Sequence, residues 1–134
     1  MDFWLSNEDS KNMNDCCVIL RVLKLSMATG KWYSLNRMKD ARYGHACTSV
    51  TINNRPGLVV SGGVSNFSRN MTSVEFYDVT SGQWVSFPPL QRGRRGHAMM
   101  VEEGRLIVLG GMQGKSKKDK NNYLVDSELF DGKR

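Results

Sequence analysis

Short apolar stretches, some alternating with polar residues and some continuous, recur along this chain between clusters of glycine, proline, asparagine and serine. In residues 21–27 the side chains of Leu23, Leu25 and Met27 share one side, which predicts a half-buried strand with that side inward. Residues 58–60 and 106–109 are continuously apolar, which favours buried strands. No stretch indicates a helix. The pattern therefore predicts an all-β chain.

The predicted strands recur in a fixed order. They cover residues 21–27, 32–35, 45–52, 58–61, 72–79, 84–87, 97–101, 106–109 and 124–130. Short turns are predicted at 28–31, 53–57, 80–83 and 102–105, and longer loops at 64–71 and 112–123. Pro88 and Pro89 end the strand before them, because proline cannot donate to a strand ladder.

The same residue types return at a nearly constant spacing. Trp32 and Trp84 are 52 positions apart, as are the two Arg-x-Gly-His-Ala segments. The Gly-Gly pairs that follow an apolar run are 48 apart, and the Glu-x-Tyr/Phe-Asp steps are 53 apart. The shorter spacing predicts a turn four residues shorter in the second copy, and the longer one a loop five residues longer. Self-similarity at this period predicts a repeat architecture.

The ordered set of repeated residues resembles the Kelch motif over residues 21–134. Four short strands per unit at this period are typical of a β-propeller blade. The resemblance implies an all-β, incomplete Kelch-type β-propeller made of four-stranded antiparallel blades. The residues that carry it are Trp32, Gly44, His45, Gly62, Gly63, Glu75, Tyr77, Trp84, Gly96, His97, Gly110 and Gly111.

The resemblance also divides the chain into segments. Residues 1–15 are expected to be a disordered N-terminal segment, 16–38 the outer strands of a partial blade, 39–90 a complete Kelch repeat, and 91–134 a second repeat truncated before its last strand. Because propellers close a ring of four to eight blades, the chain is expected to be a fragment or an incomplete gene model of a longer Kelch protein. The alternative is a small protein that completes its ring by oligomerisation.

Each motif residue has an expected structural role within the resemblance. The Gly-Gly pairs are expected where neighbouring backbones approach closely, and the two tryptophans where they fill the gap between blades with a bonded indole N–H. His45 and His97 are expected to be hydrogen-bonded structural residues. Two histidines from separate repeats could share a metal, but no third ligand is visible, so no metal and no cofactor is predicted.

The net charge of +6 favours anionic partners. Because the strands of a blade run up and down, the links 36–41 and 88–93 and the loops 64–71 and 112–123 share one side of the molecule, the loop face. The four short turns share the opposite side, the hairpin face. The loop face collects Arg37, Lys39, Arg42, Arg69, Arg92, Arg94, Arg95, Lys115, Lys117, Lys118 and Lys120.

The resemblance implies a protein-interaction module in which Arg42 and Arg94 line the mouth of the loop face. Arginine captures carboxylates and phosphates through paired hydrogen bonds, so the predicted partner is an acidic or phosphorylated segment of another protein. A role implied by the family is substrate recognition in a cullin-type ubiquitin ligase adaptor. The competing interpretation is that residues 115–120 are a solvated loop and that both arginines make internal bonds.

Two other classes of function are disfavoured. Galactose-oxidase-like copper enzymes need a Tyr, His and Cys set, and Cys47 and Tyr77 show no such arrangement. No nucleophile–base pair or paired carboxylates can be argued, so no catalytic residue is predicted. Nucleic-acid binding would need aromatic residues interleaved with the basic loop, and the sequence does not provide them.

Cysteine content and the N-terminal residues bear on the compartment. Cys16, Cys17 and Cys47 give no disulfide framework, and the acidic N-terminal residues do not resemble a signal peptide. The longest apolar run, residues 16–20, is too short to cross a bilayer, so no membrane contact is predicted. A cytoplasmic protein with reduced thiols is expected. The sequons at Asn66 and Asn70 would be glycosylated only in a secreted protein.

Overall fold

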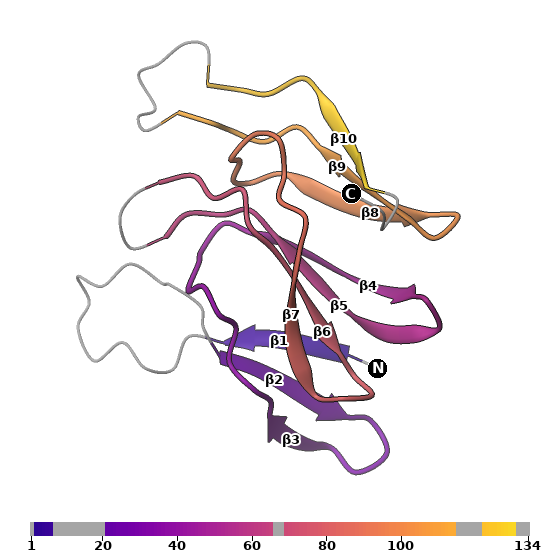
Figure 1. Ribbon diagram of the computed structural model, residues 1–134. Coiled ribbons are helices and arrows are strands. Elements are labelled where there is room, and N and C mark those ends of the chain that lie inside the picture. The colour runs from indigo at the N-terminus through magenta and orange to yellow at the C-terminus, as the bar shows by residue number, and fades with distance from the viewer. Residues whose placement is uncertain (1, 7–20, 66–68, 115–121, 131–134) are drawn as a thin grey trace, which may run out of the picture.

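The computed structural model describes residues 2–6, 21–65, 69–114 and 122–130. The regular secondary structure in these ranges consists of β-strands alone (Figure 1). The strands form three antiparallel sheets, which we call the first (β1-β2-β3), the middle (β4-β5-β6-β7) and the third (β8-β9-β10). Their bounds are β1 Asp2–Ser6, β2 Arg21–Ser26, β3 Lys31–Ser34, β4 Ala46–Ile52, β5 Arg55–Ser61, β6 Val74–Asp78, β7 Gln83–Phe87, β8 Ala98–Glu102, β9 Arg105–Leu109 and β10 Ser127–Phe130.

The middle sheet is a four-stranded meander in which each strand pairs with the next. Only Asn53 and Asn54 separate β4 from β5, and their φ angles of 50° and 59° suit a two-residue hairpin between twisted strands. The predicted turn at 53–57 is wrong at its end, because Pro56 and Gly57 pair with β4 as part of β5. Asparagine tolerates positive φ, so the turn can be this tight.

The third sheet repeats this hairpin in shorter form. Glu103 and Gly104 alone join β8 to β9, with φ angles of 49° and 73°. β8 and β9 have five residues each, whereas β4 and β5 have seven each. The prediction of a shorter turn is therefore wrong: both turns have two residues, and the four missing positions come from the strands.

The first sheet contains a strand that the sequence did not predict. β1 pairs antiparallel with β2, from Asp2 opposite Leu25 to Ser6 opposite Arg21. The expected disorder of residues 1–15 is therefore wrong for residues 2–6, and residues 7–15 lie outside the described residues. The edge of β2 offers backbone N–H and C=O groups that need partners, and β1 supplies them.

The buried side of β2 is opposite to the predicted one. Val22 is fully buried toward the middle sheet, whereas Leu23 and Leu25 are half-buried and Met27 is 71% exposed. The alternation of residues 21–27 correctly separates two sides of a strand. It does not determine which side the neighbouring sheet covers, and here the middle sheet covers the Val22 side.

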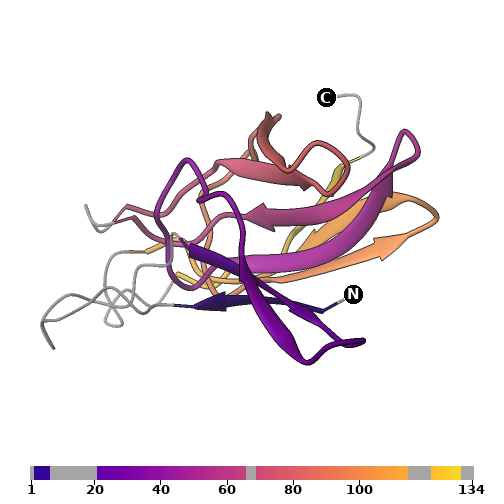
Figure 2. The same cartoon turned by 90° about the horizontal axis from the view of Figure 1, so that it is seen from below.

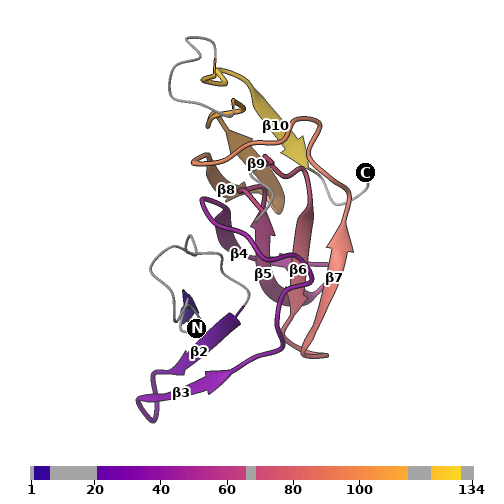
Figure 3. The same cartoon turned by 90° about the vertical axis from the view of Figure 1, so that its left-hand side faces the viewer.

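The three sheets stack face to face (Figures 1 and 3). The inner strands β4 and β8 contact each other. The core cluster that joins the first and middle sheets contains Val22, Met38, Leu58, Val60 and Tyr77. The cluster that joins the middle and third sheets contains Val50, Val59, Val74, Phe76, Leu90, Leu106 and Val108.

The loops and the hairpin turns lie at opposite ends of the strands. In Figure 1 the links and the described ends of the loops are on the left and the hairpin turns on the right, and the view from below in Figure 2 shows the same separation. The backbone thus has the two faces that strand parity predicts, and the loop face is the place to search for a binding site.

Candidate functional site

A buried ion pair anchors the first link to the middle sheet. The guanidinium of Arg42 lies 2.6 Å from the Glu75 carboxylate of β6 and donates to the Gly62 carbonyl at 2.9 Å. The same carboxylate accepts the backbone N–H groups of Lys39 and Asp40 at 2.8 and 3.1 Å. We call this arrangement the Glu75 clamp. It holds the backbone of the link at a fixed place on the loop face.

The third sheet carries the same arrangement. Arg94 lies 2.7 Å from the Glu128 carboxylate of β10 and donates to the Gly110 carbonyl at 2.8 Å. Glu128 accepts the backbone N–H groups of Gln91 and Arg92 at 2.7 and 3.2 Å. This Glu128 clamp shows that the repeat extends beyond the sequence motif to its hydrogen bonds.

The two clamps correct one expectation about the binding surface. The side chains of Arg42 and Arg94 are 0% exposed and are engaged inside the protein. Their placement at the mouth of the loop face is therefore wrong, because a partner cannot reach either guanidinium. The sequence held a clue: a glutamate follows each arginine after 33 or 34 positions in both repeats.

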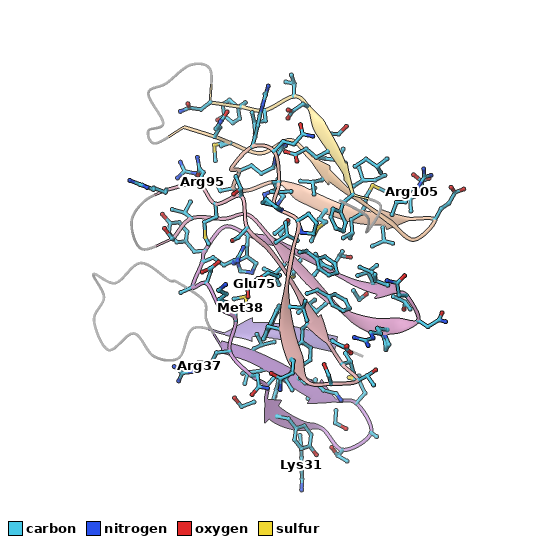
Figure 4. The ribbon with its side chains drawn as sticks, in the orientation of Figure 1. Lys31, Arg37, Met38, Glu75, Arg95 and Arg105 are labelled. Carbon is cyan, nitrogen blue, oxygen red and sulfur yellow. The ribbon has the colours of Figure 1, made fainter. Side chains whose placement is uncertain are left out.

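Other predicted cations of the loop face do reach solvent. Arg92 carries an ion pair with Asp126 at 3.3 Å and is still 56% exposed. Figure 4 shows Arg37 and Arg95 extending on the loop side and Arg105 on the hairpin side. Of the predicted set, Arg37, Lys39, Arg69 and Arg92 are exposed and Arg95 is half-buried. The predicted lysines Lys115, Lys117, Lys118 and Lys120 lie outside the described residues.

The two Arg-x-Gly turns lie side by side on this face. The Gly96 N–H donates to the Gly44 carbonyl at 2.8 Å, and a Cβ added to Gly44 would lie 3.6 Å from the Cβ of Arg95. Gly44 and Arg95 are therefore neighbours in adjacent blades, and Arg95 and Tyr43, which precedes Gly44 in the chain, are both half-buried. Sequence analysis did not single out Tyr43, because the residue type at this motif position changes between the copies.

The two motif histidines lie just before the inner strands β4 and β8, and His97 is buried whereas His45 is half-buried. His97 Nε2 lies 2.8 Å from Ser61 Oγ, which joins the third sheet to the middle one. Burial and the nearby Arg42 lower the pKa of His45 to about 4. Burial, Arg94 and His45 lower the pKa of His97 to about 4, although Glu128 acts in the opposite direction. Both rings are therefore neutral at pH 7, and in the described ranges no three His, Cys, Asp or Glu residues are grouped to hold a metal ion.

The two tryptophans differ in their surroundings. The Trp84 indole N–H donates to the Asn36 carbonyl at 2.7 Å, and its ring lies 5.3 Å from that of Tyr77. Trp84 thus joins the middle sheet to the link that leaves the first sheet. Trp32, the equivalent residue of β3, is 51% exposed.

The first Gly-Gly pair lies where the middle and third sheets meet. A Cβ on Gly62 would come within 2.4 Å of the Arg94 carbonyl oxygen. The Gly63 N–H donates to that same carbonyl at 2.8 Å. Gly63 has a φ of 93°, which is also the φ of Gly111 in the next blade. A residue with a side chain at position 62 would separate the two backbones.

In the residues described, no helix is long and apolar enough to cross a membrane.

Stacked antiparallel sheets with a repeated Arg-x-Gly-His turn and a repeated Arg–Glu clamp define a repeat protein built from β-propeller blades. Residues 41–91, which include the whole middle sheet and the Arg42–Glu75 ion pair, match the Kelch motif. The chain is a Kelch-repeat protein, and its sheets are blades of the Kelch type. Kelch repeats form protein-interaction modules, and this chain is a module of that class.

Curated proteins from several animals are similar to this chain. It is 32% identical over 105 residues to putative protein tag-53 of Caenorhabditis elegans, which covers 73% of this chain and 8% of that protein. It is 29% identical over 109 residues to alpha-scruin of Limulus polyphemus, covering 81% and 11%. It is 30% identical over 98 residues to Kelch-like protein 15 of Danio rerio, covering 69% and 16%. The matched part of the chain thus spans a small fraction of each relative.

Proposed function

We propose that this chain binds an acidic or phosphorylated segment of another protein through its loop face. The observation that carries the proposal is the set of exposed cations on that face, Arg37, Lys39, Arg69 and Arg92, with Arg95 beside them. Clustered positive charge attracts an acidic segment and orients its approach. The carboxylates of Asp40 and Asp126 lie nearby, and two negative charges offset only part of the charge of these five cations.

The clamps support the proposal by fixing the backbone beneath these cations. Glu75 and Glu128 bind the links through backbone N–H groups, which leaves the side chains of Lys39 and Arg92 outside. A backbone that is already fixed loses less conformational entropy when a partner binds. Tyr43 and Arg95 hold the same motif position in neighbouring blades, and both are half-buried, so each side chain is partly open to solvent. Tyrosine and arginine are enriched among the residues that dominate interface energies.

A narrower form of the proposal is substrate recognition in a cullin-type ubiquitin ligase adaptor. It is supported only by family resemblance and by relatives such as Kelch-like protein 15 and the F-box/kelch-repeat protein SKIP20 of Arabidopsis thaliana. Co-purification of the protein with a cullin would support this form. If the protein does not co-purify with a cullin, only this narrower form fails, and the acidic-segment proposal is unaffected.

An intracellular setting is also proposed, since the exposed Cys47 is a free thiol.

The test compares two charge-matched double variants. Lys39→Glu with Arg95→Glu changes the loop face, and Lys31→Glu with Arg105→Glu makes the same charge change on the hairpin face. Binding of a fluorescent glutamate-rich peptide and of its phosphoserine version is measured by anisotropy at 150 mM salt. We expect the loop-face variant to weaken binding by roughly tenfold or more and the hairpin-face variant by less than about twofold. Equal losses would contradict the proposal, because they would show that only the net charge matters.

A further inference from the structure

The third sheet has an exposed apolar side that faces away from the middle sheet. Cross-strand register places Met100 opposite Ile107 and Leu129 opposite Ile107, so these side chains share one side with Leu109 and Ala98. Met100 is 46% exposed, Leu109 40% and Leu129 46%. Large apolar side chains gathered on one sheet side mark a surface that another element covers.

The equivalent side of the middle sheet is covered by the third sheet, which shows what kind of element packs on such a side. At the repeat spacings of 48 and 53, Ile107 corresponds to Val59 and Leu129 to Phe76. Val59 and Phe76 are buried in the cluster that also contains Leu106 of the third sheet. The side of the third sheet that carries Ile107 and Leu129 therefore has the position that receives a further blade.

Backbone groups repeat along with the side chains. The Gly63 N–H donates to the Arg94 carbonyl, and the Thr72 carbonyl accepts the Leu90 N–H, each at 2.8 Å between the middle and third sheets. Gly111 and Val125 are their counterparts in the third sheet, and Gly111 has the same φ of 93° as Gly63. The third sheet thus presents the hydrogen-bonding groups of an existing blade junction as well as its apolar side.

The first sheet has the complementary side. Leu23 and Leu25 are half-buried and Trp32 is 51% exposed on the side of this sheet that faces away from the middle sheet. Leu25 and Trp32 correspond to Tyr77 and Trp84, 52 positions later, which pack toward the first sheet. The outer side of the first sheet is therefore of the kind that packs on a preceding blade.

We propose that the third sheet of one chain docks the first sheet of a second copy, and that the reciprocal contact closes a two-chain ring. The described residues of each chain form three stacked sheets, so those of two copies supply six, which lies within the four to eight blades of closed propellers. Repeated head-to-tail contacts with the same rotation form a ring when the rotation closes. The two open sides of each chain, which lie at opposite ends of the stack in Figure 3, both become buried.

The experiment measures molar mass by size-exclusion chromatography with light scattering over a hundredfold range of concentration, with circular dichroism to confirm folding. We expect a β-rich species of twice the 15.1 kDa chain mass. Leu129→Arg on the third sheet and Leu25→Arg on the first sheet should each raise the dissociation concentration by roughly tenfold or more. Val85→Arg is the matched control, since Val85 is 46% exposed on β7 of the middle sheet and should leave the mass unchanged.

Mixing the two face variants tests the head-to-tail arrangement. The mixture keeps one unmodified junction, between the third sheet of the Leu25 variant and the first sheet of the Leu129 variant, so dimers should reappear. A folded monomer, an unfolded wild-type chain, a dimer insensitive to both variants, or a mixture that stays monomeric would each overturn the proposal. If Leu129→Arg loses the β-sheet spectrum, Met100→Glu replaces it on the same surface.

Discussion

Replacing Glu75 by glutamine removes the charge of the Glu75 clamp and keeps the size of the side chain. The N–H groups of Lys39 and Asp40 bind different carboxylate oxygens, at 2.8 and 3.1 Å, so the single oxygen of glutamine keeps only one of these two bonds in place. The Arg42 guanidinium, which is 0% exposed, loses its opposite charge at 2.6 Å. Combining the change with Arg42→Met then separates the effect of the buried charge from that of the lost hydrogen bond.

The expected loss of stability is large for a single isosteric change. Removing one partner of a buried ion pair destabilises proteins by about 3–5 kcal/mol, because the remaining charge is buried without compensation. A chain of this size has a free energy of unfolding of roughly 7–20 kcal/mol. The exposed pair of Arg105 with Glu103 gives a control: the two side chains are 47% and 78% exposed, so Arg105→Met should cost less than about 1 kcal/mol.

Urea denaturation followed by circular dichroism, at one fixed protein concentration, measures these differences. The variants are Glu75→Gln, Arg42→Met, the two combined, and Arg105→Met. Combining Arg42→Met with Glu75→Gln removes the uncompensated charge, so the double variant should cost about 1–3 kcal/mol less than the sum of the singles. The reasoning fails if Glu75→Gln costs no more than Arg105→Met, or if the two singles are additive.

Three further predictions concern the blade junctions. Burial lowers the pKa of His97 from 6.5 to about 4, so the neutral ring favours the folded state. The contribution of this residue to stability should therefore be full above pH 6.5 and fall by about 2 kcal/mol between pH 7 and pH 5. His97→Asn should flatten that slope in urea titrations at several pH values. Gly62→Ala should destabilise the chain by at least about 3 kcal/mol, because the new Cβ would meet the Arg94 carbonyl oxygen at 2.4 Å. Gly104→Ala, whose new Cβ would have nothing within 4 Å, should cost only about 1 kcal/mol because of its positive φ. Similar thermal midpoints for the two variants would contradict this prediction. Trp84→Phe should cost about 1 kcal/mol or more because it removes the bond to the Asn36 carbonyl, and Trp32→Phe, on the exposed β3, should cost less than Trp84→Phe in the same assay.

The repeat made most of the fold predictable from sequence. Alternation and glycine positions place nine of the ten strands within a few residues, because each strand has an apolar side and each turn a distinctive composition. β1 was missed because it has no equivalent in the repeat: its five residues acquire a partner only when β2 presents its edge. The orientation of β2 was predicted wrongly because a neighbouring sheet, and not the strand itself, determines which side is buried.

The binding surface was less predictable than the fold. An arginine just before a strand would ordinarily be assigned to the surface. Arg42 and Arg94 are nevertheless buried, because each pairs with a glutamate more than thirty residues away. Such a pair forms only when the strands of a blade assemble, and a local sequence pattern does not indicate it. The loop face followed from parity alone, so the sequence placed Lys39 and Arg92 on the correct side without revealing what holds them there.

The clamps separate the chemistry of the links from the stability of the blades. Because Glu75 and Glu128 hold main-chain N–H groups, these hydrogen bonds do not depend on which side chains the link residues carry. Substitution at the exposed Lys39 can therefore change the charge of the surface while the Glu75 clamp stays as it is. The links are natural positions for randomised libraries, in which one scaffold could be selected against partners of opposite charge.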